Sequence, residues 1–259
     1  MSVMTETVSL TDLQWAKLTG FGLKPAAEQD QQYALDSVLL LDDEQCLATL
    51  NAIMPELGAP DLKVTASLVI KRSAFLLLAP TLYAMSVFDK GLDASIDNCV
   101  FEYQLHNRLW RSGMPLKQTQ ALPCQHDRSA WRELILSGAF AGHLTPLIEQ
   151  LQRLSGVSPR ILWENVAVRV FSIYERRILP ALDSERRRQA EGDLAYLLDE
   201  STRSVFELDE NPLTRFYRTK RHWQAHAEPV RMRRTCCYYY QATEPPEFCS
   251  NCPLLLKRK

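Results

Sequence analysis

Four of the seven cysteines lie within a short C-terminal stretch, and they carry the clearest chemistry in the sequence. Cys236 and Cys237 are adjacent, a spacer of eleven residues follows, and Cys249 and Cys252 form a C-x-x-C pair. In a reducing compartment, clustered thiols bind metal more often than they form disulfides. The other cysteines, at positions 46, 99 and 124, stand alone, and we expect small buried side chains there. The four C-terminal cysteines therefore predict a metal centre.

Zinc and iron–sulfur clusters both suit four thiolates. Structural zinc sites usually take two chelating pairs, each separated by two to four residues, and Cys249 and Cys252 fit that pattern. The adjacent pair does not, because neighbouring side chains of an extended chain point to opposite sides. A [2Fe–2S] cluster is longer and offers two irons, so it accommodates such a pair more easily. The spacing favours iron–sulfur, with zinc and a disulfide as the alternatives.

Basic and aromatic residues surround both cysteine pairs. The basic ones are Arg231, Arg233 and Arg234 before the first pair and Lys257, Arg258 and Lys259 after the second. Because a four-thiolate [2Fe–2S] centre gains negative charge on reduction, nearby cations favour its reduced form. The aromatic ones are Tyr238, Tyr239, Tyr240 and Phe248. We expect these rings to shield the centre from water or to pack the lobe onto the body.

The charge of the chain is unevenly distributed. The 259 residues carry a formal net charge of −1, with 46% hydrophobic and 24% charged residues, which excludes a disordered or collagen-like chain. Residues 212–259 hold 10 basic and 3 acidic residues, whereas the remainder holds 20 basic and 28 acidic ones. An acidic body therefore carries a basic C-terminal segment, which could attract an anionic ligand or an acidic partner at low salt.

The elements expected to position the cysteines are mainly helices. Capping residues and apolar periodicity predict helices over residues 12–20, 26–40, 43–54, 61–88, 128–136, 139–154, 158–178 and 184–198. We expect Pro80 to kink or split the long fourth helix. Within that helix, Lys71 and Arg72 are expected to lie on a solvated face, as are Arg169, Arg176 and Arg177 of the seventh.

A strand pattern interrupts the helices. Alternating residues over 99–106, followed by 109–122, predict a β-hairpin. The fold class is therefore α+β, with a predominantly α-helical body, a small antiparallel hairpin and a C-terminal, loop-rich four-cysteine lobe. The predicted division is an N-terminal helical region over 1–60, a mainly helical domain over 61–229 and the cysteine lobe over 230–259.

Targeting and cofactor motifs narrow the function classes. The N-terminus lacks the basic segment and the following apolar segment of a secretory signal sequence. The longest apolar run, residues 73–88, is shorter than the roughly 18 residues that a membrane-spanning helix needs. We expect a cytoplasmic protein, with peripheral association at the inner membrane as the alternative. No Gly-rich dinucleotide or P-loop motif occurs, so electrons would arrive from another protein. No G-x-S-x-G nucleophile motif occurs either.

The C-terminal motif resembles a known family. Residues 233–254, with the adjacent cysteines, the spacer and the C-x-x-C, resemble the C-terminal signature of the FhuF-type ferric siderophore reductases. The stretch 161–165, with Trp163-Glu164-Asn165, and the Asn211-Pro212-Leu213 element are similar to upstream elements of that family, as is the apolar segment that contains Pro80. The resemblance therefore extends from about residue 60 to the end. The spacer of eleven residues is one longer than the family's. The resemblance implies that Cys236, Cys237, Cys249 and Cys252 hold one [2Fe–2S] cluster.

The resemblance also implies an activity, namely one-electron reduction of a ferric siderophore of the hydroxamate or mixed type. The implied donor is a ferredoxin or a flavoprotein reductase, and no nucleic acid is involved. No catalytic acid, base or nucleophile is expected, and Arg233, Arg234 and Asn165 are the candidate substrate contacts. Two alternatives remain open: a non-enzymatic zinc-knuckle protein whose basic flank binds nucleic acid, and an iron–sulfur electron carrier or sensor.

Overall fold

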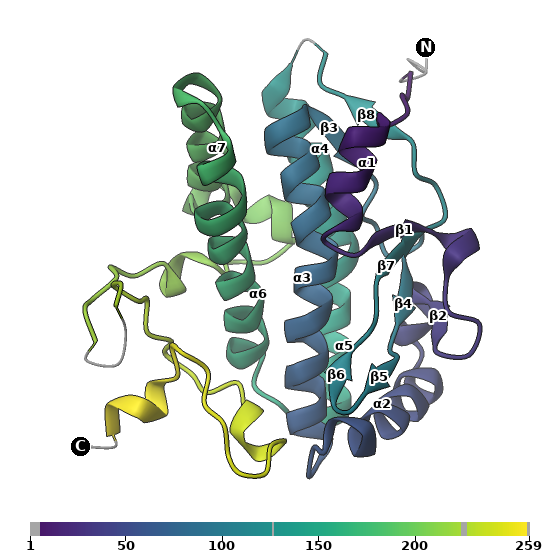
Figure 1. Ribbon diagram of the computed structural model, residues 1–259, viewed down its shortest axis with the longest axis vertical. Coiled ribbons are helices and arrows are strands. Elements are labelled where there is room, and N and C mark those ends of the chain that lie inside the picture. The colour runs from purple at the N-terminus through teal and green to yellow at the C-terminus, as the bar shows by residue number, and fades with distance from the viewer. Residues whose placement is uncertain (1–5, 126, 224–226, 258–259) are drawn as a thin grey trace.

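A long apolar helix forms the centre of the molecule (Figure 1). The computed structural model describes residues 6–125, 127–223 and 227–257. Helix α3 (Leu62–Phe88) begins at Asp61, whose carboxylate accepts a hydrogen bond from the amide of Val64 at 2.9 Å. Most of its side chains are buried, because other helices cover it on several sides. Within the described part of the chain, no helix has the length and apolar character to cross a membrane.

Pro80 does not split α3, which continues without interruption to Phe88. A proline removes one amide donor and crowds the preceding turn. The Thr81 hydroxyl donates to the Leu77 carbonyl at 2.7 Å within this turn. Both residues are buried against the surrounding helices, and this packing holds the helix together through the proline.

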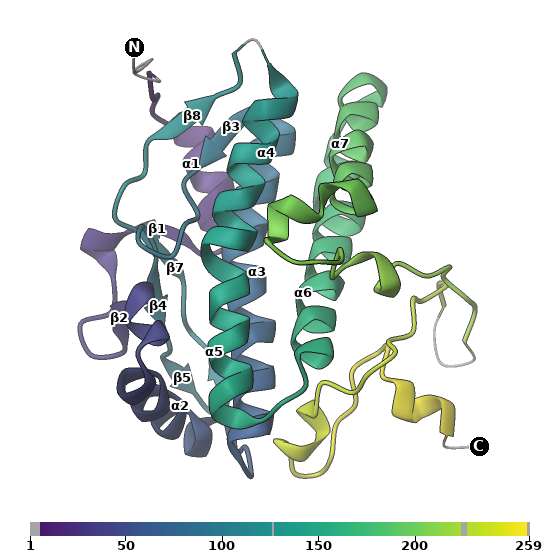
Figure 2. The ribbon, with the colours of Figure 1, turned by 180° about the vertical axis from the view of Figure 1, so that it is seen from behind.

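A second long helical rod packs on the face of α3 that points away from the viewer in Figure 1; in Figure 2, seen from behind, this rod lies in front of α3. It consists of α4 (Arg128–Ala139), a π-turn over Phe140–Leu144 and α5 (Thr145–Ser155), and it ends at Gly156 with φ of 68°. The expected break between residues 136 and 139 is therefore wrong, because α4 itself continues to Ala139 and the π-turn then joins it directly to α5. Helices α6 (Pro159–Ile173) and α7 (Ser184–Leu197) were predicted, and a π-turn over Tyr174–Ile178 extends α6 to the expected end.

Two shorter helices precede α3. Helix α1 (Asp12–Thr19) has the expected capping box, in which Thr11 and Gln14 exchange side-chain to backbone hydrogen bonds. Helix α2 (Asp43–Leu57) continues through Pro55 and ends at Gly58, whose φ of 69° suits glycine. Both helices pack on α3 in one common core. The division of the chain at residues 60 and 229 stays a prediction.

The helix expected over residues 26–40 is wrong. This segment holds strand β2 (Ala34–Asp36), which pairs antiparallel with β4 (Val100–Glu102), between two short 3₁₀ turns. Asp30 accepts hydrogen bonds from the amides of Gln32 and Tyr33 and bends the chain before the strand. Local turn chemistry and a distant strand partner together override the helical pattern.

In the described parts of the chain, the strands form four small two-stranded sheets beside α3. Strand β1 (Leu23–Pro25) pairs in parallel with β7 (Met114–Leu116), and β3 (Lys90–Leu92) pairs antiparallel with β8 (Ala121–Pro123). The predicted hairpin is confirmed only at its tip, where β5 (Leu105–His106) and β6 (Leu109–Trp110) flank a two-residue turn. The turn residues have φ of 50° and 61°, as a primed turn requires. Beyond this tip the predicted strands do not pair with each other: β4 pairs with β2, β7 with β1 and β8 with β3.

A buried histidine in the π-turn makes the fold sensitive to acid. His143 is 3% exposed, and its Nδ1–H donates to the Ala94 carbonyl at 3.0 Å. Burial lowers the pKa of His143 from 6.5 to about 4, against the opposing effect of this hydrogen bond. The folded protein therefore keeps this ring neutral at a pH where the unfolded chain already binds a proton.

We expect the free energy of unfolding to fall as the pH decreases from 6.5 toward 4, and His143 to account for about 2 kcal/mol of this loss at pH 5. In His143→Asn that contribution should disappear, which urea denaturation at pH 8 and pH 5 measures. The exposed His106 provides the control, since His106→Asn should retain the full pH dependence. Equal pH dependence in wild type and His143→Asn would contradict the assignment.

Candidate metal centre

The four C-terminal cysteines lie together in a loop with only short 3₁₀ turns. Cys237 and Cys252 are 2% and 3% exposed, and Cys236 and Cys249 are half-buried. The sulfurs of Cys237 and Cys249 are 3.3 Å apart, which is well beyond a disulfide bond of about 2.05 Å. Burial raises the pKa of Cys236, and the nearby thiols of Cys252 and Cys237 add to this effect. The sulfurs thus form two neighbouring pairs, Cys237 with Cys249 and Cys236 with Cys252, and no disulfide joins any of the four.

A tight turn brings the adjacent cysteines into one site. Tyr238, directly after them, has φ of 62°, and its amide donates to the sulfur of Cys236 at 3.3 Å. In the C-x-x-C segment, the Cys252 amide donates to the Cys249 carbonyl at 3.0 Å. The side chains of adjacent residues therefore do not diverge as they would in an extended strand.

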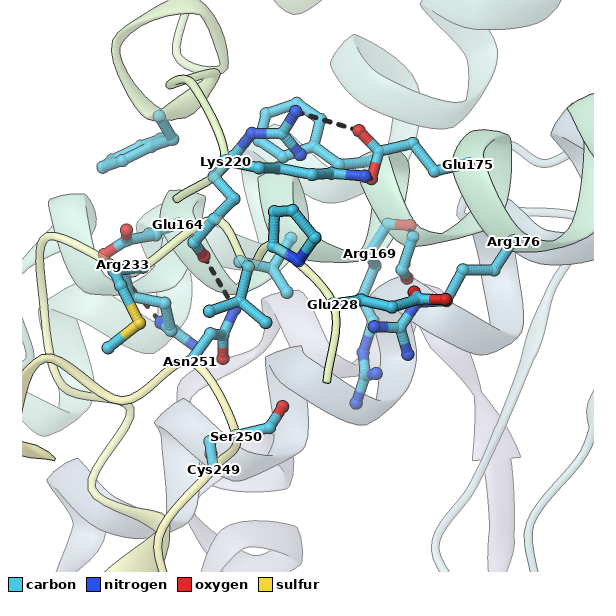
Figure 3. A pocket seen from close by; sticks show the side chains of 18 of the residues that line it. Glu164, Arg169, Glu175, Arg176, Lys220, Glu228, Arg233, Cys249, Ser250 and Asn251 are labelled. Carbon is cyan, nitrogen blue, oxygen red and sulfur yellow. Dashed lines mark hydrogen bonds and ion pairs between the residues drawn. The ribbon is translucent and has the colours of Figure 1, made fainter. Parts of the chain in front are cut away.

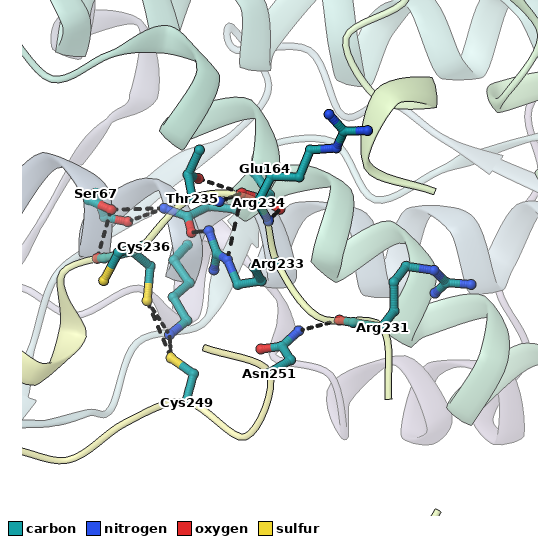
Figure 4. A network of polar contacts seen from close by, with 12 residues as sticks. Ser67, Glu164, Arg231, Arg233, Arg234, Thr235, Cys236, Cys249 and Asn251 are labelled. Carbon is teal, nitrogen blue, oxygen red and sulfur yellow. Dashed lines mark hydrogen bonds and ion pairs between the residues drawn. The ribbon is translucent and has the colours of Figure 1, made fainter. Parts of the chain in front are cut away.

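Helix α6 holds the segment before the first cysteine pair (Figure 4). The carboxylate of Glu164 accepts hydrogen bonds from the amides of Arg234 and Thr235, both at 2.6 Å, and from the Thr235 hydroxyl. Glu164 is 2% exposed, so these donors replace water as partners of the buried charge. The carboxylate fixes the backbone directly before Cys236.

A second chain of hydrogen bonds joins the loop to α3. The Asn165 amide group donates to both the carbonyl and the hydroxyl of Ser67 at 2.9 Å, and the Ser67 hydroxyl donates to the Cys237 carbonyl at 2.9 Å. Arg233 donates to the Asn165 side-chain oxygen at 2.6 Å. Ser67 and Asn165 are fully buried, so this contact between α3, α6 and the loop is shielded from water.

Positive charge surrounds one sulfur pair. The ammonium group of Lys71, on α3, lies 3.5 Å from the sulfur of Cys237 and 3.2 Å from that of Cys249. The hydrogen bond from Cys249, together with the charges of Lys71 and Arg233, lowers the pKa of Cys237. Burial lowers the pKa of the Arg169 guanidinium, whereas the nearby cysteines act to raise it. These cations stabilise thiolates, which are the form that binds metal.

The residues present fit a [2Fe–2S] cluster. Soft thiolates in two pairs suit a group with two iron atoms, and fixed cations suit its negative charge. The buried Nε of Arg233 has no hydrogen-bond partner in the described residues, and its nearest carboxylate oxygen, on Glu164, is 4.0 Å away. Across the same described residues, no three His, Cys, Asp or Glu side chains converge as they would around a single metal ion.

The candidate substrate contacts occupy different environments. Asn165 and Arg233 are 0% and 4% exposed and help to hold the cysteine loop, whereas the Arg234 side chain is exposed. Substrate contact by these three residues stays a prediction. Arg258 and Lys259, two of the cations expected near the second cysteine pair, lie outside the described residues.

Lys71 and Arg169 were expected on solvated faces, but both lie at the cysteines. Each lies more than 60 residues away in sequence from the cysteines that it approaches, which no local pattern reveals. One signal was present: Lys71 and Arg72 interrupt an otherwise apolar helix. Charged residues in such a position need a partner. Glu164 lay inside the stretch that resembles the family, but its role as an anchor was not anticipated.

A pocket of about 470 Å³ opens beside Cys249 (Figure 3). Its walls come from α6 and its π-turn, from the cysteine loop and the chain before it, and from Lys71 of α3, and they include Arg169 and Cys249. A second pocket, of about 480 Å³, lies between α3, the β5–β6 hairpin and the loop. Lys71, Arg169 and Tyr239 line both pockets. A small molecule in the first pocket would therefore lie next to a cysteine sulfur.

Comparisons with known protein families cover two parts of the chain. Residues 67–223 match the family described as "Ferric iron reductase FhuF-like transporter", and residues 233–254 match the "FhuF 2Fe-2S C-terminal domain". No curated protein matches the chain. The first match covers more than half of the sequence and includes Lys71, Glu164 and Asn165, and the second includes all four clustered cysteines. The resemblance inferred from the C-terminal motif is thus confirmed, and the chain belongs to the FhuF-like ferric iron reductase family, with a [2Fe–2S] cluster as its cofactor.

Proposed function

We propose that this protein reduces ferric siderophores by one electron, with a [2Fe–2S] cluster held by Cys236, Cys237, Cys249 and Cys252. The observation that carries the proposal is the arrangement of these thiols in two pairs, one of them beside the Lys71 ammonium. Membership of a ferric iron reductase family supports the reaction class. The same pairing argues against a structural zinc knuckle, which needs four ligands around one ion.

The chemistry requires little beyond positioning. When bound, a [2Fe–2S] cluster supplies one electron at a time. Hydroxamate and carboxylate oxygens are hard ligands that hold Fe(III) tightly and Fe(II) far more weakly, so one electron releases the iron and leaves the chelator intact. No bond of the chelator is cleaved, which agrees with the expectation that no catalytic triad takes part.

The protein's own residues support this chemistry in two ways. Lys71 and Arg233 place positive charge beside the sulfurs and so stabilise added negative charge there. The Lys71 ammonium lies 5.0 Å from the ring centre of Tyr239. This cation–π contact helps to hold the ammonium beside the sulfurs.

The substrate, donor and location are also part of the proposal. Siderophores of the hydroxamate or mixed type are the substrates, and a ferredoxin or flavoprotein reductase in the cytoplasm supplies the electron. The absence of a dinucleotide motif from the sequence supports an external protein donor. The basic residues of the segment 212–259 provide a surface for an acidic donor.

The function is tested by iron release. Anaerobic protein, reduced with dithionite and freed of excess reductant, should convert a ferric trihydroxamate to Fe(II) at about one iron per reduced cluster. A ferrous-specific chromophore measures the product, and bleaching of the protein absorbance measures the electron donated. Protein that is reduced but releases no Fe(II) from hydroxamate or mixed chelates would be an electron carrier or sensor and not a reductase.

The ligand assignment is tested by single serine variants. Replacing any one of the four clustered cysteines should lower the iron and sulfide content well below the expected two of each, because a hard hydroxyl replaces a soft thiolate. Cys46→Ser provides the control, since Cys46 is fully buried in α2, far from the loop in sequence. Metal analysis and electron paramagnetic resonance of the reduced protein report the result. Zinc in place of iron, or a full cluster in Cys237→Ser, would count against the assignment.

The role of the Lys71 charge is tested by the reduction potential. One unit charge about 5 Å from another, at an effective dielectric constant of about 40, contributes about 1.7 kcal/mol, or roughly 70 mV for one electron. Lys71→Met should therefore lower the midpoint potential by about this amount, and Lys71→Arg should retain most of it. Lys63→Met, an exposed position on α3, should leave the potential unchanged. An intact cluster with an unchanged potential in Lys71→Met would refute this role.

A further inference from the structure

One side of the pocket beside Cys249 is a basic stripe on α6 and the π-turn that extends it. Arg169, Ser172 and Arg176 all line the pocket, at positions i, i+3 and i+7 of one helical run. Arg177 follows directly but does not line it. Figure 3 shows Arg169 reaching toward the side of the pocket where Ser250 and Cys249 lie. The stripe therefore faces the cysteine loop across the pocket.

Contacts with α3 hold the Nε and the guanidinium plane of Arg169 in place. Its Nε donates to the Lys71 carbonyl at 3.1 Å, and its guanidinium lies 5.6 Å from the ring centre of Phe75. Neither contact uses the terminal nitrogens, which carry four of the five guanidinium donors. The side chain is thus oriented by α3 while its terminal N–H groups stay available to a ligand.

Most other cations of the pocket already have partners. Lys220 and Arg231 both pair with Glu175, at 2.8 Å and 2.9 Å, and Arg233 donates to Asn165. Arg176 makes no hydrogen bond or ion pair in the described parts of the chain, and its side chain is exposed. Among the arginines that line this pocket, Arg169 and Arg176 are therefore the two whose terminal nitrogens make no hydrogen bond or ion pair within the described residues.

The carboxylates of the pocket do not neutralise this pair. Glu175 is engaged by two cations, and Glu164 accepts the backbone amides before Cys236. The remaining carboxylate, Glu228, is drawn near the two arginines in Figure 3, but it is exposed and forms no ion pair with either within the described residues, and its single negative charge offsets only one of their two positive charges. Paired charges cancel locally, so the available charge on the α6 side is positive.

On the basis of the proposed function, we propose that this pocket binds the ferric complex and that Arg169 and Arg176 select complexes with free or iron-bound carboxylate groups. A guanidinium group binds a carboxylate through two parallel N–H···O bonds, which an uncharged hydroxamate complex accepts less well. The volume of about 470 Å³ suits a compact chelate or part of a larger one. The preferred substrates are therefore anionic, carboxylate-bearing ferric complexes, and a complex bound here lies beside Cys249.

Redox-inert gallium(III) complexes separate binding from reduction, because Ga(III) resembles Fe(III) in charge and size. Titration calorimetry of the cluster-loaded protein would compare anionic gallium(III) citrate with uncharged tris(acetohydroxamato)gallium(III). We expect the wild type to prefer the citrate complex. Arg176→Gln should weaken citrate binding by about tenfold or more and leave hydroxamate binding within about twofold, since a charge-assisted hydrogen bond is lost only with the anion.

Arg177→Gln is the matched control, because it removes the neighbouring charge outside the pocket and should retain wild-type affinities. Arg169→Gln should act like Arg176→Gln, and Arg169→Lys should recover part of the loss because it keeps the charge. The cluster absorbance of each variant verifies that the cysteine loop is intact. Higher salt should weaken citrate binding more in the wild type than in Arg176→Gln.

Three results would overturn the inference: no preference of the wild type for citrate, unchanged citrate binding in Arg176→Gln, or an equal loss in Arg177→Gln. Failure of the proposed function looks different. In that case the gallium complexes would bind with the predicted selectivity, but the reduced protein would release no Fe(II) from the corresponding ferric complexes.

Discussion

The cysteine loop depends on one buried contact, in which two consecutive residues of α6 hold it against α3. The segment 230–257 has only short 3₁₀ turns and few backbone hydrogen bonds of its own, such as that from the Arg233 amide to the Asn251 carbonyl, so the helical body must fix the rest of the loop. Glu164 provides this constraint by accepting two backbone amides and a hydroxyl, and Asn165 does so through Ser67 and Arg233. Because these groups are buried, loss of one partner would leave another polar group without water or protein to satisfy it.

This contact also explains why charged residues interrupt the most apolar helix of the molecule. Once Ser67 fixes the Cys237 carbonyl, the next turn of α3 brings Lys71 to the sulfurs. The Lys71 carbonyl in turn accepts from Arg169, one helical turn beyond Asn165 on α6. One turn of α3 and of α6 thus provides Ser67 and Asn165, which anchor the loop. The next turn of each helix provides the charged residues Lys71 and Arg169 beside it.

The sequence revealed the features that depend on neighbouring residues. The four cysteines were recognisable because their spacing is local, and caps such as Thr11 and Asp183 marked where helices begin. Residues 26–40 were misread as a helix because the strand over Ala34–Asp36 depends on a partner near residue 101. The positions of Lys71 and Arg169 at the cysteines depend on tertiary packing of α3 on α6, which no spacing encodes. The same limit applies to Arg233, whose charge was evident but whose burial against Asn165 was not.

The hydrophobic core has a bearing on how the protein is assembled in the cell. The buried side chains of α1 to α7 form one continuous core, and the four clustered cysteines are not members of it. The helical body can therefore complete its folding on the energy of apolar burial alone. The proposed cluster site lies outside this core and leaves Cys236 and Cys249 partly exposed, so uptake of iron and sulfide can follow folding as a separate event.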